Sequence, residues 1–569
     1  MFLYDWIPQQ PPAIVARGLE LATPGAPGFA LACLPLLILC LLSLSKRWAS
    51  FTDRPIVFAL THSLPFFLFT FQDSLGDSGQ VLDGVHARYH MSEPLATWSH
   101  YWFFKFLHGP FNIGAKDAVG LTSRVAGFFY LLFVAKISLK LYPDLSASRR
   151  LLHRLVFLTA GVAFLFYGYI ENPPLALPAE QLWVLLSLSF LQSPTMRNLA
   201  ASAAALSIAA LLHGRASFLF PALAFGCLIP AGSLMQRLGR AAVGSLVFFG
   251  CIAAFVSYVF VIEPNHISGG HLGNVTGGGN RQMFVELGQM FGAEHWQPIV
   301  RSLLIFGGLI APLGLLRLGT MWVKPSAVSV WCLGYFVADV VYLFLWEFDY
   351  GPYIDWDLVA SGVCPLLLMG SILVVRSKIP TVVFLPLLLG SAYMGNAWAV
   401  LVNGAPLAPN FTPTAAAPRA EIACATKGLK RTYYRDGNLS EPAGPSEAEN
   451  PFLEFNPAKI AQVAPGGAPN GLGGVFEGFV VIPKEGRYRF FVLGQGNSRL
   501  TIGGLTVVNR WIGHEWRVSS EREIRFPSAG RYPIRLEFFT VNQNFPVMLE
   551  MESSDYDRRR VALDDFCFD

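Results

Sequence analysis

The feature that most constrains this chain is a series of apolar runs, each long enough to cross a hydrocarbon core of about 30 Å as a helix. About twelve of these runs precede residue 403. They cover residues 28–45, 55–71, 119–141, 154–170, 175–192, 199–213, 216–233, 241–262, 299–317, 327–346, 357–375 and 380–402. Because a helix satisfies its own backbone hydrogen bonds in lipid, we expect a polytopic all-α membrane region with about twelve transmembrane helices.

Charged residues divide the chain into two regions. The first 402 residues carry 42 charged side chains, whereas residues 403–569 carry 38, which is close to the density of a soluble domain. Residues 403–420 are rich in Pro, Ala and Thr, a composition typical of a linker. We therefore predict a membrane domain over residues 1–402, this linker, and a water-soluble domain over residues 421–569.

The composition also excludes several classes of protein. With 53% hydrophobic and 14% charged residues, the chain differs from disordered and fibrous proteins. Its net charge is only +4 and its basic residues are scattered, so we expect no nucleic-acid partner. The cysteines form no Cys-x-x-Cys pair, so no zinc site is expected. The N-terminal stretch lacks the charged region and cleavage site of a secretory signal, and we expect it to remain in the protein.

Basic residues in the short loops predict the orientation of the membrane domain, because cytoplasmic loops are enriched in Lys and Arg. Alternate loops carry Lys46, Arg47, Arg54, Arg149, Arg150, Arg154, Arg197, Arg237, Arg240, Arg317, Lys324, Arg376 and Lys378. The intervening loops hold almost all of the acids and histidines. We therefore expect a multi-pass protein whose C-terminal domain lies outside the cytoplasm. The lack of an obvious retention signal favours a bacterial inner membrane and a periplasmic domain.

Two cysteines, Cys424 and Cys567, bracket the predicted soluble domain. In an oxidising compartment a disulfide between them would contribute about 4–5 kcal/mol on the loop-entropy model. Two free thiols fit the sequence equally well, so both alternatives stay open.

The first outer loop, residues 72–118, has the most informative sequence. Asp73, Asp77 and Asp83 follow the second apolar run, and the stretch SEPLATWSHYWFFKFL mixes aromatic and polar residues as an interfacial helix does. An ordinary aromatic belt explains the aromatic residues alone. The order of the acids and the later stretch suggests a catalytic loop.

That order resembles the first outer loop of the GT-C superfamily of membrane glycosyltransferases, which includes the protein O-mannosyltransferases and the lipid A aminoarabinose transferases. The segment LGDSG (75–79) stands where those families carry an acid pair, and EPLATW (93–98) stands where they carry a Lys-Pro-Pro-Leu-aromatic-aromatic-Trp stretch. Ser78 replaces the second acid and Glu93 replaces the lysine. The resemblance implies a GT-C-like fold for the membrane domain.

The resemblance also implies a reaction. The donor would be a sugar on a polyprenyl phosphate, and the acceptor would be a glycan, lipid or protein on the outer side of the membrane. A carboxylate must take the proton of the acceptor hydroxyl, which is a poor nucleophile. Asp77 is the first candidate for this base, and Asp73, Asp83 and Glu171 are the further candidates.

Other polar residues of the outer loops are candidates for binding the substrate. The leaving phosphate needs cations or hydrogen-bond donors. Arg215, between the sixth and seventh runs, is well placed, with His213 beside it and Arg88 in the first loop. Glu93, also in the first loop, is a further candidate for binding. For Arg215 the alternative is a turn residue whose side chain extends to the lipid interface.

The segment Asp355-Trp356-Asp357 has the carboxylates and aromatic ring with which proteins often hold sugars. The Asp-x-Asp spacing also suits a divalent cation, and helix capping is a third interpretation. The sequence therefore leaves the need for a metal open. Asp339 lies within an apolar run, where a carboxylate is a functional candidate by default, but a polar partner inside the bundle also explains it.

From about residue 471 the sequence alternates between apolar and polar residues, with turn residues between the segments, which predicts an all-β sandwich. The order of its motifs over residues 421–555 resembles the protective-antigen-type β-sandwich, a recurrent carbohydrate-binding module. Calcium-dependent members carry an Asp-Asp pair where this chain has GQGN (494–497), so calcium-dependent sugar binding is not expected.

Together these features favour a GT-C-type, polyprenyl-phosphate-dependent glycosyltransferase that contacts membrane lipid. A lipid-linked glycan transporter or flippase is one alternative, but it needs polar residues reaching both faces, and the acids here gather on one side. A non-enzymatic, membrane-anchored glycan receptor is another, and it leaves the many apolar runs unexplained.

Overall fold

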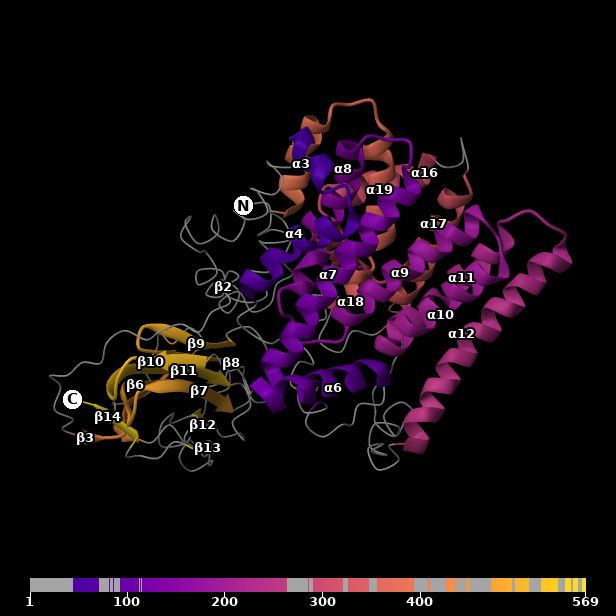
Figure 1. Ribbon diagram of the computed structural model, residues 1–569. Coiled ribbons are helices and arrows are strands. Elements are labelled where there is room, and N and C mark those ends of the chain that lie inside the picture. Colours follow the sequence, from indigo (N-terminus) through magenta and orange to yellow (C-terminus); the bar gives the residue numbers. More distant parts are fainter. Residues whose placement is uncertain are drawn as a thin grey trace. The chain divides into compact units, whose positions relative to one another are not determined.

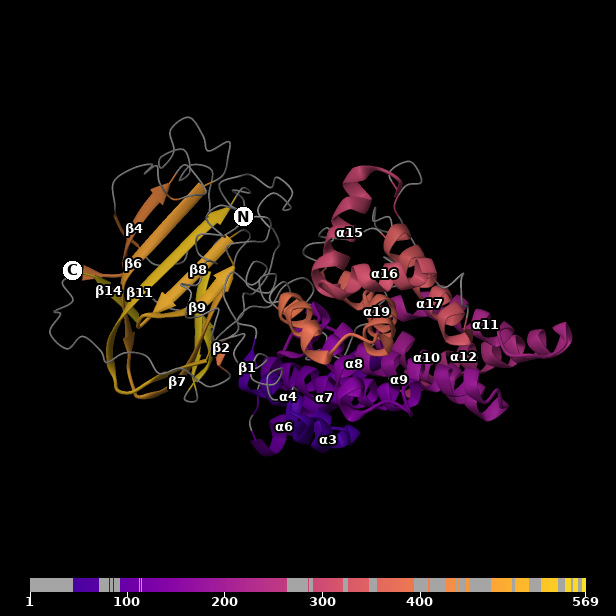
Figure 2. The same cartoon turned by 90° about the horizontal axis from the view of Figure 1, so that it is seen from above.

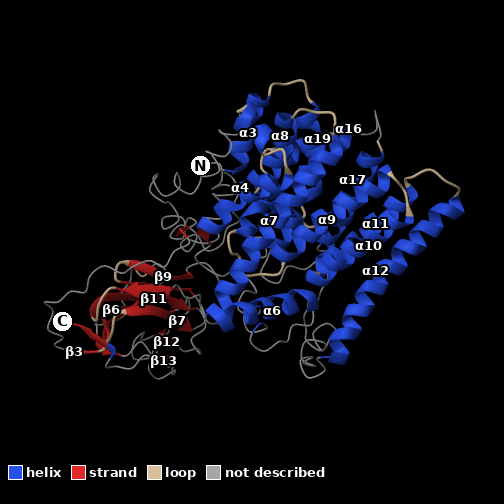
Figure 3. Ribbon diagram, viewed as in Figure 1, coloured by secondary structure: helices blue, strands red, loops and turns tan. Residues whose placement is uncertain are grey.

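The computed structural model describes residues 45–70, 81, 85, 93–111, 113, 115–262, 285, 290–320, 326–346, 356–392, 408–409, 426–434, 439, 447–449, 472–493, 497–510, 523–540, 548–553, 556–560 and 565–568. The chain divides into two compact units. One runs over Ala30–Thr70 and Leu75–Trp398, and the described residues of the other lie within Ala399–Asp569. The described parts of the first unit are almost entirely helical, and those of the second are mostly strands (Figure 3).

The helical unit begins with short N-terminal helices and continues through long apolar ones. Its elements are α3 (Lys46–Phe51), α4 (Pro55–Leu68), β1 (Phe69–Thr70), α6 (Pro94–Phe111), α7 (Ala115–Leu141), α8 (Ala147–Thr159), η2 (Gly161–Phe166), α9 (Pro173–Gln192), α10 (Met196–Leu212), η3 (Gly214–Leu219), α11 (Phe220–Leu228), α12 (Leu234–Ile262), α15 (Ala293–Gly307), α16 (Ile310–Thr320), α17 (Ala327–Leu345), α18 (Trp356–Ser361), α19 (Cys364–Arg376) and η5 (Thr381–Phe384).

Five helices in the described part of the chain are long and apolar enough to cross a membrane. They are Ala115–Leu141, Pro173–Gln192, Leu234–Val259, Ala327–Leu345 and Leu358–Arg376. A bent pair, His295–Gly307 with Ile310–Gly319, adds a sixth if it forms one span. These helices indicate a multi-pass membrane protein and confirm the helical nature of the N-terminal region. The expected total of about twelve stays a prediction, since the run 28–45 lies almost wholly outside the described residues.

The predicted span 154–170 is not one continuous helix. It consists of α8 and η2, which are separated at Ala160, where the backbone is extended. A β-carbon at the next residue, Gly161, would lie 2.8 Å from the Phe306 α-carbon. The break therefore occurs where the chain packs closely against α15, a contact that hydropathy alone does not reveal.

In the first half of the unit, α7 packs mainly against two helices that are not its immediate neighbours in the chain. Helix α7 contacts α4 and α9, α9 contacts α10, and α10, α11 and α12 lie side by side (Figure 1). Helices α16 and α19 approach each other at small residues: a β-carbon at Gly370 would lie 2.7 Å from the Ile310 carbonyl oxygen. Such contacts between small residues and backbone are the usual means by which helices associate in lipid.

One end of the bundle is held by ion pairs between loops that the sequence predicts to be cytoplasmic. The Asp53 carboxylate lies 2.6 Å from Arg150 Nη2 and 3.1 Å from Arg154 Nη2. Arg154 is fully buried and also donates to the Thr52 carbonyl oxygen at 2.6 Å. These contacts join the α3–α4 turn to α8. The hydrogen bond from Arg150 holds the pKa of Asp53 below its ordinary value, although partial burial opposes this shift.

The second unit is an antiparallel β structure. Its strands are β2 (Ala408–Pro409), β3 (Thr426–Lys427), β4 (Leu429–Tyr434), β5 (Glu447–Glu449), β6 (Leu472–Ile482), β7 (Gly486–Leu493), β8 (Asn497–Ile502), β9 (Leu505–Arg510), β10 (Glu523–Phe526), β11 (Gly530–Thr540), β12 (Met548–Ser553), β13 (Tyr556–Arg560) and β14 (Phe566–Phe568). One sheet has the order β10-β7-β12-β13, and the larger one has β3-β14-β6-β11-β8-β9 with β4 beside β6 and β5 beside β4. Figure 2 shows β4, β6, β11, β8 and β9 side by side.

The period-two pattern of the sequence places alternate residues of these strands in one buried core. Phe476, Phe490, Leu500 and Tyr532 all belong to it. The Tyr532 ring packs edge-on against Phe526, with ring centroids 4.6 Å apart. The predicted C-terminal antiparallel sheet domain is therefore confirmed.

Cys567, in β14, forms a disulfide. Cys424, the partner that the sequence leaves open for it, lies outside the described residues, so the identity of the partner is not settled by the described residues.

Candidate active site

The structure describes the side chains of only some of the residues that the sequence singles out. Asp73, Asp77, Asp83, Arg88 and Asp355 lie outside the described residues, as do the side chains of Trp356 and Asp357 at the start of α18. Their expected roles stay predictions. Glu93, Glu171, His213 and Arg215 are described.

Glu93 directly precedes α6 and joins it to two other segments. One carboxylate oxygen, Oε1, lies 3.3 Å from His213 Nε2 and accepts a hydrogen bond from the Gly214 backbone nitrogen at 3.4 Å. The other, Oε2, accepts a hydrogen bond from Asn172 Nδ2. Three loops that the sequence predicts to lie on the outer side therefore meet at one carboxylate.

Asn172 lies at the start of α9 and connects this helix to Glu93. It is the N-cap residue, and Pro173 and Pro174 open the helix, where the missing N–H of proline costs no hydrogen bond. Glu171, beside it, is only 6% exposed. Burial of a carboxyl group at this position keeps Glu171 a candidate for proton transfer.

His100 of α6 adds a further polar contact, which reaches α7. It is buried, and its Nδ1 lies 3.1 Å from the Thr122 hydroxyl of α7. We call Glu93, His100, Thr122, Glu171, Asn172 and His213 the α6 cluster. His100 also makes a side-chain hydrogen bond with Asn172, so the cluster joins α6 to the start of α9.

A second polar group lies deeper in the bundle and is centred on Arg215. Its guanidinium contacts Glu180 Oε2 of α9 at 3.0 Å, and its Nη2 donates to Asp339 Oδ1 of α17. The Tyr335 hydroxyl, also on α17, donates to Glu180 Oε1. We call Arg215, Glu180 and Asp339 the buried triad, because none of the three side chains is more than 4% exposed.

The two groups are connected at the start of η3. The backbone nitrogen of Arg215 donates to His213 Nδ1 at 3.2 Å, while His213 Nε2 faces Glu93. His213 thus belongs to the α6 cluster and orients the turn that directs Arg215 toward Glu180 and Asp339. The expected roles of Arg215 and His213 in donor binding stay predictions.

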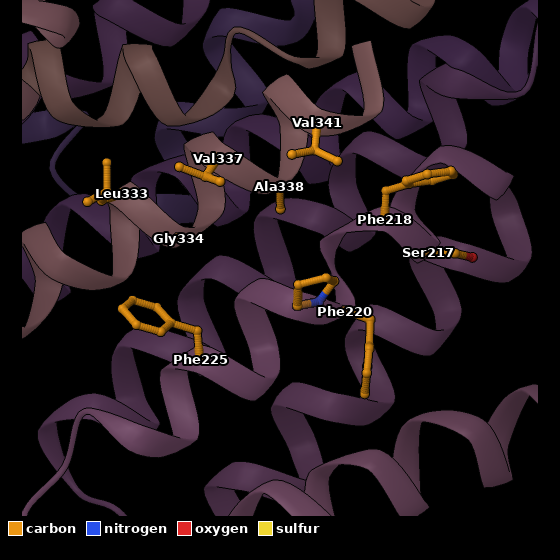
Figure 4. Close-up of a pocket in the computed structure, with 10 residues that line it drawn as sticks. Ser217, Phe218, Phe220, Phe225, Leu333, Gly334, Val337, Ala338 and Val341 are labelled. Carbon is orange, nitrogen blue, oxygen red and sulfur yellow. The ribbon is translucent and has the colours of Figure 1, made fainter. Parts of the chain in front are cut away.

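An apolar groove of about 660 Å³ runs beside the buried triad. One wall is formed by η3 and α11, and the other by α17, with Phe218, Phe220 and Phe225 facing Val337, Ala338 and Val341 (Figure 4). Ser217 is the one polar residue among the lining side chains that the structure describes. A groove with this lining fits a hydrocarbon chain better than a polar ligand.

Sequence reasoning missed several residues of this region. Glu180 lies in an apolar run, and His100 and Thr122 lie on two helices that meet only in the fold. Asn172 stands directly before a helix, where capping alone explains an asparagine. A charged residue inside an apolar run was the available signal for Glu180, as it was for Asp339. No group of three or more metal-ligating side chains occurs within the residues whose side chains are described.

Residues 426–565 match the family model of the PA14 domain. The C-terminal region therefore contains a PA14 domain, and the protective-antigen-type β-sandwich expected from the sequence is confirmed. No curated protein matches the chain.

Solved structures are similar to each part of the chain. Two structures of ArnT from Cupriavidus metallidurans, one bound to undecaprenyl phosphate and one in the apo state, are 13% identical over 62% of this chain and 76% of theirs, with TM-scores of 0.42 and 0.43. The PA14 sugar-binding domain from an RTX adhesin is 14% identical over 26% of this chain and 100% of that chain, with a TM-score of 0.19.

An anti-sigma factor domain-containing protein from Clostridium clariflavum is 16% identical over 29% of this chain and 54% of that chain, with a TM-score of 0.22. A second protein of that description is covered over 51% of its length. This chain thus spans about half the length of both proteins.

Proposed function

We propose that this protein is a GT-C-type membrane glycosyltransferase, which moves a sugar from a polyprenyl-phosphate carrier to an acceptor at the α6 cluster. The observation that carries this proposal is the position of the apolar groove. Ser217, which lines the groove, is two residues after Arg215 in the chain. The backbone nitrogen of Arg215 donates to His213, and the His213 ring faces Glu93 of the α6 cluster. A site for a hydrocarbon chain therefore adjoins a site lined by polar groups.

A polyprenyl-phosphate sugar has the matching chemistry. Its branched hydrocarbon chain would occupy the groove between η3–α11 and α17, where burial of each CH₂ group contributes about 0.8 kcal/mol. Its phosphate and sugar would lie toward the α6 cluster. A soluble nucleotide sugar has no hydrophobic chain, so it would leave the groove without a role.

Transfer requires a base and a stabilised leaving group. A carboxylate takes the proton of the acceptor hydroxyl as the oxygen attacks the anomeric carbon, and the bond to the phosphate breaks with its electron pair on the phosphate oxygen. In this proposal Asp77 is the base, with Asp73 and Glu171 as the next candidates. A single displacement of this kind inverts the anomeric centre.

The remaining predicted residues would bind the donor. Arg88 and His213 supply cationic or donor groups for the phosphate, and Arg215 joins them only if it leaves the buried triad. Asp355, Trp356 and Asp357 would hold the sugar, with its hydroxyls on the carboxylates and its face on the indole ring. Whether Asp355 and Asp357 also hold a divalent cation is part of the test below.

The PA14 domain adds a second glycan contact in this proposal. As a recurrent carbohydrate-binding module, it would hold an acceptor glycan near the membrane surface. The disulfide of Cys567 fits an oxidising compartment, which supports a periplasmic location for the domain and a bacterial inner membrane for the helices.

The test uses purified full-length protein in lipid nanodiscs, a panel of radiolabelled polyprenyl-phosphate sugars, and mixed membrane acceptors, with and without a chelator. Loss of label from the carrier is expected for the wild type and not for Asp77→Asn. Asp144→Asn, a change in the loop between α7 and α8 at the opposite end of the bundle, is the matched control and should behave as wild type.

One result would overturn the proposal, and another would change only the residue assigned as the base. If the folded protein removes label from none of the carriers, it is not a transferase of this class. A lipid-linked glycan transporter would then move the carrier between leaflets of a liposome, and a receptor would retain glycan binding without moving anything. Full activity of Asp77→Asn would reject Asp77 as the base and direct the same test to Asp73 and Glu171.

A further inference from the structure

The buried triad lies directly behind the groove. Arg215 precedes the groove residues Ser217 and Phe218 on η3, and Asp339 follows the groove residue Ala338 on α17. The contact between Arg215 Nη2 and Asp339 Oδ1 therefore connects the two opposing walls. Apart from this contact the walls meet mainly through apolar side chains, such as Phe218 and Tyr342, whose ring centroids lie 4.9 Å apart.

The two acids of the triad accept different numbers of hydrogen bonds. Glu180 receives two donors, the Arg215 guanidinium at 3.0 Å and the Tyr335 hydroxyl. Asp339 receives Arg215 on one oxygen, and its Oδ2 is buried without a hydrogen-bond partner among the described residues. The single positive charge of the guanidinium balances the charge of only one carboxylate, and Glu180 accepts the larger number of hydrogen bonds.

The charge balance has a consequence for Asp339. Glu180 and Arg215 form a neutral pair by themselves, and Tyr335 still ties α17 to that pair through Glu180. Asp339 is then dispensable for charge neutrality. Its specific contribution is the contact from α17 to η3, across the base of the groove.

We infer that Arg215 and Asp339 are positioning residues that set the separation of the groove walls, and thereby the affinity for the hydrocarbon chain of the carrier. The inference rests on the proposed function, because it takes the carrier as the occupant of the groove. It differs from the expectation that Arg215 binds the donor phosphate. A phosphate ligand would matter equally for all carriers, whereas a residue that shapes the groove matters only when a long chain fills it.

The experiment measures binding of sugar-free polyprenyl phosphate to full-length protein in nanodiscs, with a long-chain carrier and a short-chain analogue. The wild type should bind the long chain more tightly. Asp339→Leu, which keeps the Glu180–Arg215 pair, should reduce this preference by about tenfold, equivalent to about 1.4 kcal/mol, and should leave short-chain affinity unchanged. Asp339→Asn still accepts a hydrogen bond from Arg215 and should restore the preference.

Val341→Trp and Val337→Trp are the positive controls. Both residues line the groove, and their side chains are 44% and 49% exposed, so a larger residue there fills the groove without disturbing the core. Each should abolish the preference for the long chain while the buried triad stays intact. Asp339→Ser, which also lacks the carboxylate but is smaller than leucine, provides a second test if Asp339→Leu does not fold.

The outcomes separate the inference from the proposed function. Equal losses for both carriers in the Asp339 variants would overturn the inference, since that result identifies a phosphate site or a general effect on structure. An unchanged preference in Asp339→Leu and Asp339→Ser would overturn it as well. If the wild type binds neither carrier, the groove is not a carrier site, and the proposed function fails together with the inference.

Discussion

The Glu93 carboxylate lies 3.3 Å from His213 Nε2 and so connects the start of α6 to the turn between α10 and η3. The same carboxylate accepts hydrogen bonds from Asn172 and from the Gly214 backbone. The acid therefore joins three segments at one end of the bundle.

Glu93→Ala removes the acceptor for all of these contacts. We expect kcat to fall by about a hundredfold, because a shift of about 1 Å in the α10–η3 turn misplaces the groups that face the donor. Glu93→Gln retains an acceptor oxygen and should lose less. Steady-state kinetics and thermal unfolding of both variants give the comparison. An Ala variant with wild-type kcat would show that the junction at Glu93 does not position the site.

The coupling of Glu93 to His213 can be measured separately from activity. In a double-mutant cycle of Glu93→Ala and His213→Ala, we expect a coupling free energy of about 0.5–3 kcal/mol in unfolding, as found for residues in one hydrogen-bond network. Thermal unfolding in nanodiscs is the measurement. Strictly additive effects would contradict a direct interaction between the two side chains.

The ion pairs of Asp53 predict how stability depends on pH. The hydrogen bond from Arg150 holds the folded pKa of Asp53 below its ordinary value, with burial as a smaller opposing effect. A lowered folded pKa means that the stabilisation is present above the unfolded pKa, which is about 3.9 for Asp, and is lost as the pH falls through the folded pKa. We therefore expect unfolding to become easier below about pH 4.

Asp53→Asn tests the source of that dependence. The variant leaves the buried Arg154 without its carboxylate partner, and we expect a loss of about 1–3 kcal/mol at neutral pH. The difference between variant and wild type should shrink as the pH falls below about 4, and it should disappear below the folded pKa, where Asp53 is protonated in both folded and unfolded protein. Thermal unfolding at neutral and acidic pH measures both. A difference that stays constant with pH would assign the acid sensitivity to other carboxyl groups.

The sequence predicted the two regions and their secondary structure because those properties are local. Apolar runs identify helices such as α7 and α12, and alternation identifies strands such as β6 and β11. What the sequence did not reveal depends on which elements become neighbours. Glu180 and Asp339 are far apart in the chain and are brought to one guanidinium by the packing of α9, η3 and α17.

The same distinction applies to the candidate site. Glu93 and His213 are predicted from their chemistry as binding candidates in loops on the same side, and the contact between them follows from the fold. His100 and Thr122 were not singled out, because a histidine in a predicted interfacial helix and a threonine in an apolar run are ordinary until the two helices meet. The break at Ala160 was missed for the same reason, since it depends on Phe306 of a distant helix.

The close approach of α16 and α19 predicts a site where size alone decides stability. At Gly370 a β-carbon would lie 2.7 Å from the Ile310 carbonyl oxygen, which is backbone and cannot rotate away. Gly370→Val should therefore separate the helices and cost about 1–3 kcal/mol or more. Gly250→Val on α12, where nothing lies within 4 Å of the added carbon, is the matched control. Equal thermal stability of the two variants would contradict the close contact.

The PA14 domain offers a test that separates a hydrogen bond from core packing at one residue. The Tyr532 hydroxyl donates to the Ser528 carbonyl oxygen at 2.8 Å, and its ring is fully buried against Phe526. Tyr532→Phe removes only the hydrogen bond and should cost about 1 kcal/mol. Tyr532→Ala also removes the ring and should cost about 3–5 kcal/mol.

Hydrogen exchange of the β11 amides in the full-length protein measures both changes, because exchange of this core strand reports the opening of the sandwich. The expected order is wild type, then Tyr532→Phe, then Tyr532→Ala, with the larger step between the two variants. Tyr488→Phe is a matched control on β7, since the Tyr488 hydroxyl donates to the Lys484 carbonyl oxygen at 2.9 Å and should lose a similar amount. If Tyr532→Phe alone were as damaging as Tyr532→Ala, the turn that carries Ser528, and not the packing of the ring, would hold the two sheets together.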